Sequence, residues 1–206
     1  MSQAEDHSTR RTRAPGDRAR ARIMVHAAEL ATVEGLDGLS IGRLAEATGV
    51  PKSSVHALFG SKEELQLATI NAARESFIAE VVTPAFADAA PGRERLVALC
   101  EGYLSYVERR VFPGGCFFVA MSAEFGARPG PVHDEVARAQ QQWRDVLEAE
   151  ARLAADRHEL PKGTDATQLA FELGVMLAGT NIVTVLHNDD GAIDRARTAI
   201  RWRLAT

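Results

Sequence analysis

The sequence predicts an all-α protein with an N-terminal three-helix helix-turn-helix domain and a larger C-terminal helical domain. Alanine, leucine, arginine and glutamate are abundant, and the alternating runs typical of strands are absent. Apolar residues make up 46% and charged residues 25% of the 206 residues, as in folded globular proteins, which excludes a largely disordered chain. Apolar stretches are short and cut by glycines over the first 65 residues and longer afterwards.

The charge of the chain is uneven. The formal net charge is −4, yet residues 7–28 carry six arginines and a single acid, Asp17. A basic end on an acidic body suits a protein that contacts a polyanion at one end. Residues 1–16, which include Pro15 and Gly16, are expected to form a disordered basic arm that can add phosphate contacts.

The sequence contains no motif typical of an enzyme, a cofactor site or a metal site. The GxSxG, GxGxxG, P-loop and HExxH patterns are absent. No stretch reaches the roughly 18 apolar residues that a membrane helix needs, so we expect a cytoplasmic protein with no membrane partner. Cys100 and Cys116 suit a reducing compartment, and buried, unreactive cysteines are favoured over a redox switch.

Local signals divide the first 60 residues into three helices. A first helix is expected over residues 17–34, ended by Gly35. Ser40 is the expected N-cap of a short second helix, Gly49 the turn after it, and Pro51 the start of a third. The third helix buries its apolar face, and its opposite face carries small or hydrogen-bonding residues that suit a DNA groove: Lys52, Ser53, Ser54, His56 and Ala57.

A longer fourth helix begins after Gly60. Ser61 and Glu64 have the spacing of a reciprocal capping box. Lys62 lies in the first turn, where a cation is unfavourable unless a phosphate binds nearby. The buried face of this helix is expected to carry Leu65, Ala68, Ala72 and Ile78.

This stretch resembles the DNA-binding module of the tetracycline-repressor (TetR) family. The specific features are LAEATGV before the third helix and LFGSKEEL after it, within a similarity that covers residues 20–77. A looser similarity to the regulatory domains of one branch of the family covers PGGCFF at residues 113–118, SAEF at 122–125 and RPGP at 128–131.

The resemblance implies a homodimer that binds a double-stranded DNA operator, usually represses transcription, and leaves DNA when a small-molecule effector binds. It implies a DNA-binding domain over residues 17–64, a ligand-binding and dimerisation domain over residues 65–206, and no enzyme activity. His56 stands where the family usually has a tyrosine that touches the DNA backbone, and an imidazole can still donate to a phosphate. The resemblance assigns Lys52, Ser53, Ser54 and Ala57 to the groove, and Ser40, Arg43, His56 and Lys62 to phosphates. Arg43 has an alternative partner in Glu46.

Five more helices are predicted in the rest of the chain, and the last two are the expected dimer interface. Their expected ranges are 93–110, 116–125, 132–157, 165–187 and 192–204. The helix over 116–125 is apolar nearly all round and is expected at the centre of the core. The helix over 165–187 has more apolar residues than one stripe buries, so it needs partners on several sides. The resemblance implies a four-helix bundle between two copies; the alternative is a fully buried helix in a monomer.

Six large side chains are the candidates for lining a ligand cavity: Tyr103, Phe117, Phe118, Met121, Phe125 and Trp143. Apolar walls with few polar groups are typical of small-molecule sites, and plain core packing is the alternative for each residue. The alternative function for the whole chain is a helical small-molecule-binding protein or enzyme that makes no contact with DNA.

Overall fold

The computed structural model describes residue 20 and residues 23–205; the predicted arm over residues 1–16 lies outside them. The described residues form helices and no strand, which confirms the all-α prediction. After a helix over residues 23–34 come α2 (Ile41–Thr48), α3 (Lys52–Phe59), α4 (Lys62–Phe77), the π-helical η1 (Ile78–Val82), α5 (Thr83–Asp88), α6 (Arg93–Glu108), α7 (Phe117–Phe125), α8 (Pro131–Asp156), α9 (Ala166–His187) and α10 (Gly191–Arg203).

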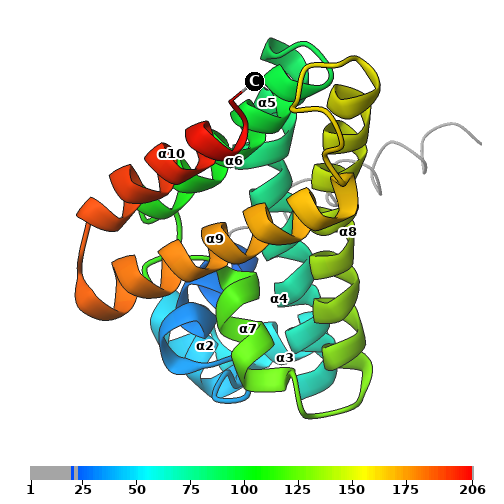
Figure 1. The fold of residues 1–206 in the computed structure, drawn as a ribbon. Coiled ribbons are helices and arrows are strands. Elements are labelled where there is room, and N and C mark those ends of the chain that lie inside the picture. The colour runs from blue at the N-terminus through cyan, green and yellow to red at the C-terminus, as the bar shows by residue number, and fades with distance from the viewer. Residues whose placement is uncertain (1–19, 21–22, 206) are drawn as a thin grey trace, which may run out of the picture.

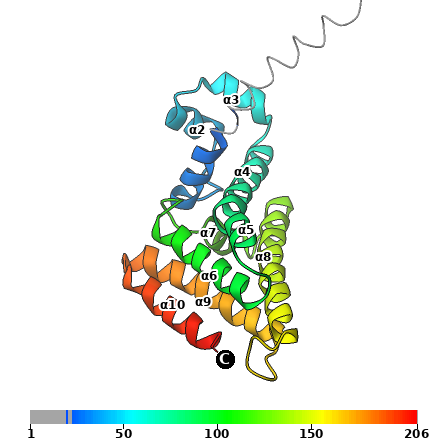
Figure 2. The same cartoon turned by 90° about the horizontal axis from the view of Figure 1, so that it is seen from above.

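The helices form a small N-terminal unit and a larger body. Figure 2 shows α2 and α3 at one end of the molecule and α6, α9 and α10 at the other, with α4 running between them. α4 continues through η1 into α5, so one bent helical rod leads from the small unit into the body. α8 packs along α9 and also contacts α4, α6 and α7, and it thereby closes the body around α7.

The expected caps and turns of the small unit are present, except for one half of the predicted capping box. Ser40 Oγ accepts a hydrogen bond from the Arg43 backbone N at 3.1 Å and caps α2. Gly49 follows α2 with a φ of 69°, in the left-handed region that favours glycine. Ser61 Oγ accepts from the Glu64 backbone N at 3.1 Å. The reciprocal half of the predicted capping box is absent, because the Ser61 N–H donates to the Phe59 carbonyl oxygen instead.

The buried face of α4 differs from the predicted one. Its buried residues are Leu65, Gln66, Thr69, Ile70, Ala73 and Phe77, so the prediction of Leu65 is confirmed. The predicted Ala68 and Ala72 are only half-buried, and Ile78 is exposed. The π-helical turn that starts at Ile78 changes the winding of the rod, and Ile78 faces a cavity rather than the core.

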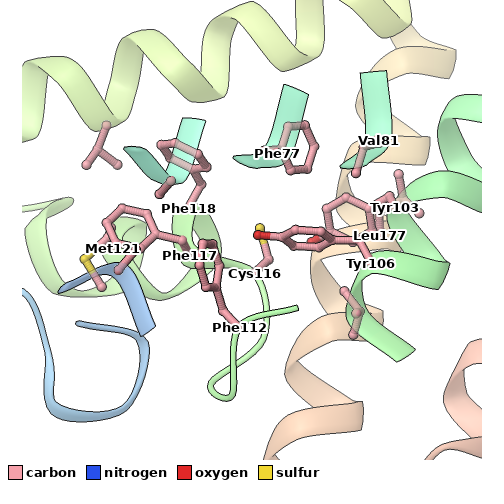
Figure 3. Close-up of a cluster of buried hydrophobic side chains, with 14 of the residues drawn as sticks. Phe77, Val81, Tyr103, Tyr106, Phe112, Cys116, Phe117, Phe118, Met121 and Leu177 are labelled. Atoms are coloured by element: carbon pink, nitrogen blue, oxygen red, sulfur yellow. The ribbon is translucent and has the colours of Figure 1, made fainter. Parts of the chain in front are cut away.

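The core of the body is rich in aromatic side chains contributed by α4, α6 and α7 (Figure 3), and Trp143 of α8 packs against it. Phe77 lies edge-on to Trp143, with ring centroids 5.1 Å apart and an interplanar angle of 85°. Phe77 also contacts Tyr103 and Tyr106 in edge-on arrangements. Phe117, Phe118, Met121 and Phe125 of α7 are buried, but Ala123 is exposed, so α7 buries one face rather than lying at the centre of the core as predicted.

Candidate DNA-binding face and internal cavity

α3 presents an exposed face at the end of the molecule (Figure 2). Val55 and Phe59 are buried against the small unit and set the rotation of the helix about its axis. The residues predicted for the groove and the neighbouring phosphate are therefore all exposed: Lys52, Ser53, Ser54, His56 and Ala57. This face has one cation and small side chains, which allow close approach to a polyanionic groove.

The guanidinium of Arg43 is already bound within the protein. Its Nε donates to Glu34 Oε2 at 2.9 Å and its Nη2 to Glu34 Oε1 at 2.6 Å. The alternative partner Glu46 lies farther away, at 3.5 Å. The hydrogen bond from Arg43 lowers the pKa of Glu34, so this pair stays ionised at neutral pH.

Lys62 is bound in the same way. Its Nζ donates to Asp37 Oδ1 at 2.8 Å, and Arg128 approaches the other oxygen of Asp37 at 3.3 Å. The hydrogen bond from Lys62 is the main reason that the pKa of Asp37 is lowered. All three side chains are exposed, and exposed ion pairs contribute little free energy, so a phosphate can compete for either cation.

Lys52 differs from Arg43 and Lys62 because it forms no ion pair with any described residue. Its Nζ lies over α2, near Gly42. Ser40, the N-cap of α2, is also exposed and lies near Gly42. Its hydroxyl accepts the hydrogen bond from the Arg43 backbone N that caps α2. Of the three predicted cationic contacts, Lys52 is therefore the one that can bind a phosphate or a base without first losing a carboxylate partner.

The body contains a partly open cavity of about 210 Å³ among α4, η1, α6, α7, α8 and α9. Of the six predicted lining residues, Tyr103, Phe118 and Trp143 line it. Phe125 lines a neighbouring hollow of about 360 Å³, which shares Trp143 with the first. Phe117 and Met121 are packed in the core and line neither hollow.

Several lining residues were absent from the sequence prediction. Arg74 and Phe77 lie one turn apart on α4, and Cys116, Gln140 and Gln142 are further polar residues of the wall. Gln140 Nε2 donates to the Phe118 carbonyl oxygen at 3.2 Å and to Ser122 Oγ at 3.0 Å. The i, i+3 spacing of Arg74 and Phe77 places a cation beside an aromatic ring on one helix face, but spacing alone does not distinguish a cavity wall from a solvated surface.

The deep end of the cavity contains Tyr103 and Cys116. Tyr103 is 3% exposed, and its hydroxyl has the Cys116 thiol as a neighbour but makes no hydrogen bond of normal geometry to a described residue. The tyrosine rings of α6 extend toward Cys116 (Figure 3). Burial raises the pKa of the Tyr103 hydroxyl and of the Cys116 thiol, so both groups keep their protons. Burial likewise raises the pKa of Cys100 to about 12, as expected for an unreactive thiol.

α7 connects the cavity to the small unit. Its first turn carries Phe118 in the cavity wall, and its last turn carries Glu124. The Glu124 carboxylate accepts hydrogen bonds from the backbone N of Leu36 at 2.9 Å and of Asp37 at 2.7 Å. Displacement of α7 at the cavity would therefore move or break the hydrogen bonds that hold the turn after the helix over residues 23–34.

α9 and α10 leave an apolar face uncovered. Leu186 is 72% exposed and Trp202 is 80% exposed, and three more apolar residues of α9 are at least half exposed: Phe171, Val175 and Ile182. Among the described helices, α9 has a length and composition that would also suit a membrane span, which corrects the prediction that no stretch of the chain does. A contiguous exposed apolar face is typical of a protein interface.

Comparisons with known proteins identify the two parts of the chain. The profile of "Tetracyclin repressor-like, C-terminal domain" matches residues 92–200, and that of "Bacterial regulatory proteins, tetR family" matches residues 23–69. No curated protein sequence matches significantly.

Solved structures share the whole fold. A TetR transcriptional regulator from Chloroflexus aurantiacus J-10-FL is 24% identical, with a TM-score of 0.82 over 91% of this chain and 94% of that chain. A TetR-family regulator from Cytophaga hutchinsonii is 21% identical, with a TM-score of 0.77 over 91% and 94%. AibR, solved with isovaleryl coenzyme A and operator DNA, is 23% identical, with a TM-score of 0.69 over 90% and 98%. The two domain profiles together with this shared fold place the chain in the TetR family of DNA-binding transcriptional regulators.

Proposed function

We propose that this regulator is a repressor that dimerises through α9 and α10, binds an operator with α3, and releases it when a small molecule occupies the cavity. The observation that carries the proposal is the uncovered face of α3, which combines Lys52 with small side chains. Repression and ligand-induced release are typical of the family, and AibR has been solved with both a ligand and operator DNA. We further propose a cytoplasmic protein without enzyme activity.

The proposed DNA contacts follow from position and exposure. Lys52, Ser53, Ser54 and Ala57 are assigned to the major groove. Ser40, Arg43, His56 and Lys62 are assigned to phosphates, with residues 1–16 as an additional basic arm. The DNA-binding domain is assigned to residues 17–64 and the ligand-binding and dimerisation domain to residues 65–206. The ligand residues within the second domain are Tyr103, Phe118 and Trp143, with Phe117, Met121 and Phe125 supporting them.

A titration of duplex DNA from upstream of the protein's own gene tests the proposal. Fluorescence anisotropy at low and moderate salt, with unrelated DNA as competitor, should give binding that survives competition. Weak binding to both DNAs would place the operator elsewhere, and screening of genomic fragments would then find it. Absence of DNA binding by a folded dimer would favour the alternative of a small-molecule-binding protein that makes no contact with DNA.

Lys52→Ala is expected to weaken operator binding more than Lys62→Ala. Lys52 is not paired with a described residue, whereas Lys62 must first give up Asp37. Each lost phosphate contact should make the salt dependence shallower by about 0.9 in the log–log slope, counted once per subunit. Anisotropy titrations at four salt concentrations measure both effects. Lys162→Ala, far along the chain in the α8–α9 connection, is the matched control; an equal loss there would contradict the assignment.

Glu124→Gln is expected to uncouple the cavity from the small unit. Removal of the charge weakens the two hydrogen bonds to Leu36 and Asp37, so the orientation of the DNA-binding unit is less restricted before binding. Operator affinity should fall by about three- to tenfold, consistent with a loss on the order of 1 kcal/mol, and the two amides should exchange faster with solvent.

The matched control for this change is Glu75→Gln. Glu75 is an exposed carboxylate on α4 and makes no ion pair with a described residue. It should retain the parent affinity and the parent amide exchange at Leu36 and Asp37. Equal behaviour of the two variants would contradict the role of Glu124.

A further inference from the structure

One cation and no carboxylate line the described wall of the internal cavity. The cation is Arg74, and the other lining residues are neutral. A cationic ligand would lose its hydration on entry and gain no counter-charge, whereas an anion would meet the guanidinium. The charge of the wall therefore selects against cations.

Arg74 has capacity left for an anion. Its side chain is 34% exposed, its Nη2 donates to Asn71 Oδ1 at 3.0 Å, and its nearest carboxylate, Glu135, is 3.9 Å away. Glu135 is also paired with Arg138 on its own helix, so its charge is shared between two guanidinium groups. A ligand carboxylate could therefore form the short, charge-assisted hydrogen bonds that Arg74 does not make within the protein.

The opposite end of the cavity offers one hydrogen-bond donor. Phe77 is one turn beyond Arg74 on α4, and its ring contacts Tyr103, so the three residues follow one another into the body. The Tyr103 hydroxyl is buried beside the Cys116 thiol, a weak acceptor, and no hydrogen bond of normal geometry reaches it from a described residue. A buried hydroxyl without a partner is unfavourable, and a polar ligand atom at this position would satisfy it.

The wall between these two ends is aromatic. Phe77, Phe118 and Trp143 line it, and Phe77 and Trp143 meet edge to face. The cavity volume of about 210 Å³ exceeds the roughly 150 Å³ of an engineered apolar cavity that holds benzene. One ring, or two fused rings, with a small polar substituent at each end matches this volume.

We propose that the cavity binds an aromatic carboxylate of one or two rings. The carboxylate pairs with Arg74, the ring system packs against Phe77, Phe118 and Trp143, and a polar substituent opposite the carboxylate accepts a hydrogen bond from Tyr103. The proposal rests on the proposed function where it treats this ligand as the effector; binding itself is measured without DNA.

Isothermal titration calorimetry on the full chain tests the ligand class. The probes are 4-hydroxybenzoate, 6-hydroxy-2-naphthoate, 2-naphthoate, the methyl esters of the two hydroxy acids, and 4-hydroxybenzylamine. We expect at least one hydroxy acid to bind at least about tenfold more tightly than its ester, and the amine not to bind. An ester that binds as tightly as its acid, or failure of all the acids at millimolar concentration, would overturn the proposal.

Substitutions at two positions, Arg74 and Tyr103, locate the ligand. Arg74→Gln should abolish the difference between acid and ester, and Arg74→Lys should retain part of it. Tyr103→Phe should abolish the preference for 6-hydroxy-2-naphthoate over 2-naphthoate and leave the acid–ester ratio unchanged. The matched control is Arg152→Gln. Arg152 is an exposed arginine on α8 outside the cavity wall, and this variant should bind the probes as the unmodified protein does. An unchanged acid–ester ratio in Arg74→Gln would overturn the assignment.

Operator binding measured in parallel separates this inference from the proposed function. If the unmodified protein binds no DNA, the proposed function is contradicted, but the ligand class measured by calorimetry still stands. Equal binding of acid and ester would contradict the ligand class and leave operator binding intact. Release of operator DNA by the acid, at concentrations that calorimetry shows to saturate the cavity, would support both.

Discussion

Ile182→Glu is expected to convert the protein to a monomer and to abolish tight operator binding. Ile182 lies on the uncovered face of α9, so a two-fold dimer would bury two new carboxylates without partners. The dissociation constant of the dimer should rise by at least about 100-fold, since each buried ion costs several kcal/mol. A monomer contacts a single half-site, and operator affinity should fall by a factor on the order of 100 or more.

Light scattering after size-exclusion chromatography measures the first effect, and anisotropy with operator DNA measures the second. Val33→Glu is the matched control, because Val33 is also an exposed apolar residue but lies on the helix over residues 23–34. It should remain a dimer. If Ile182→Glu also remains a dimer at micromolar concentration, the interface proposed for α9 and α10 is wrong.

Gly114→Ala is expected to destabilise the protein by separating the small unit from the body. The segment before α7 passes so close to the helix over residues 23–34 that an added Cβ would overlap the Thr32 carbonyl oxygen. The Gly114 N–H also donates to Thr32 Oγ1 at 3.1 Å, and this bond would be lost. Overpacking against backbone should lower the free energy of unfolding by about 3 kcal/mol and the Tm by roughly 6–12 °C.

Thermal unfolding followed by circular dichroism measures this loss. Gly42→Ala is the control, since its added Cβ would have only ordinary contacts, the nearest at 3.8 Å from Ser40 Oγ. Alanine is favoured over glycine inside a helix, so this variant should melt at or slightly above the parent temperature. A Gly114→Ala protein that melts with the parent would show that the close approach to Thr32 is not required.

The parts of the fold that sequence could predict are those set by local chemistry. The cap at Ser40, the left-handed turn at Gly49, the start of α6 and the end of α9 depend on a few neighbouring residues, and the structure confirms them. For Arg43, the sequence could identify only a partner on the same helix, Glu46. Its main partner, Glu34, belongs to the preceding helix and is brought near by the packing of the two.

The cavity was predictable only in part, for a related reason. Helical periodicity identifies which side chains point inward, and it found Tyr103, Phe118 and Trp143. It cannot distinguish a side chain packed against others, such as Phe117, from one that borders a gap. Arg74 was missed because a charged residue on an amphipathic helix is normally solvated, and its place in the cavity wall depends on how α8 lies across α4.

The intrinsic fluorescence of the two tryptophans can report on two different events, because of where they lie. Trp143 borders the cavity, and Trp202 stands on the uncovered face of α10. An occupant of the cavity should change the emission of the first, and burial by a second copy should shift that of the second toward the blue. Single Trp→Phe variants would therefore let one fluorimeter record ligand occupancy and subunit association as separate signals, without an attached label.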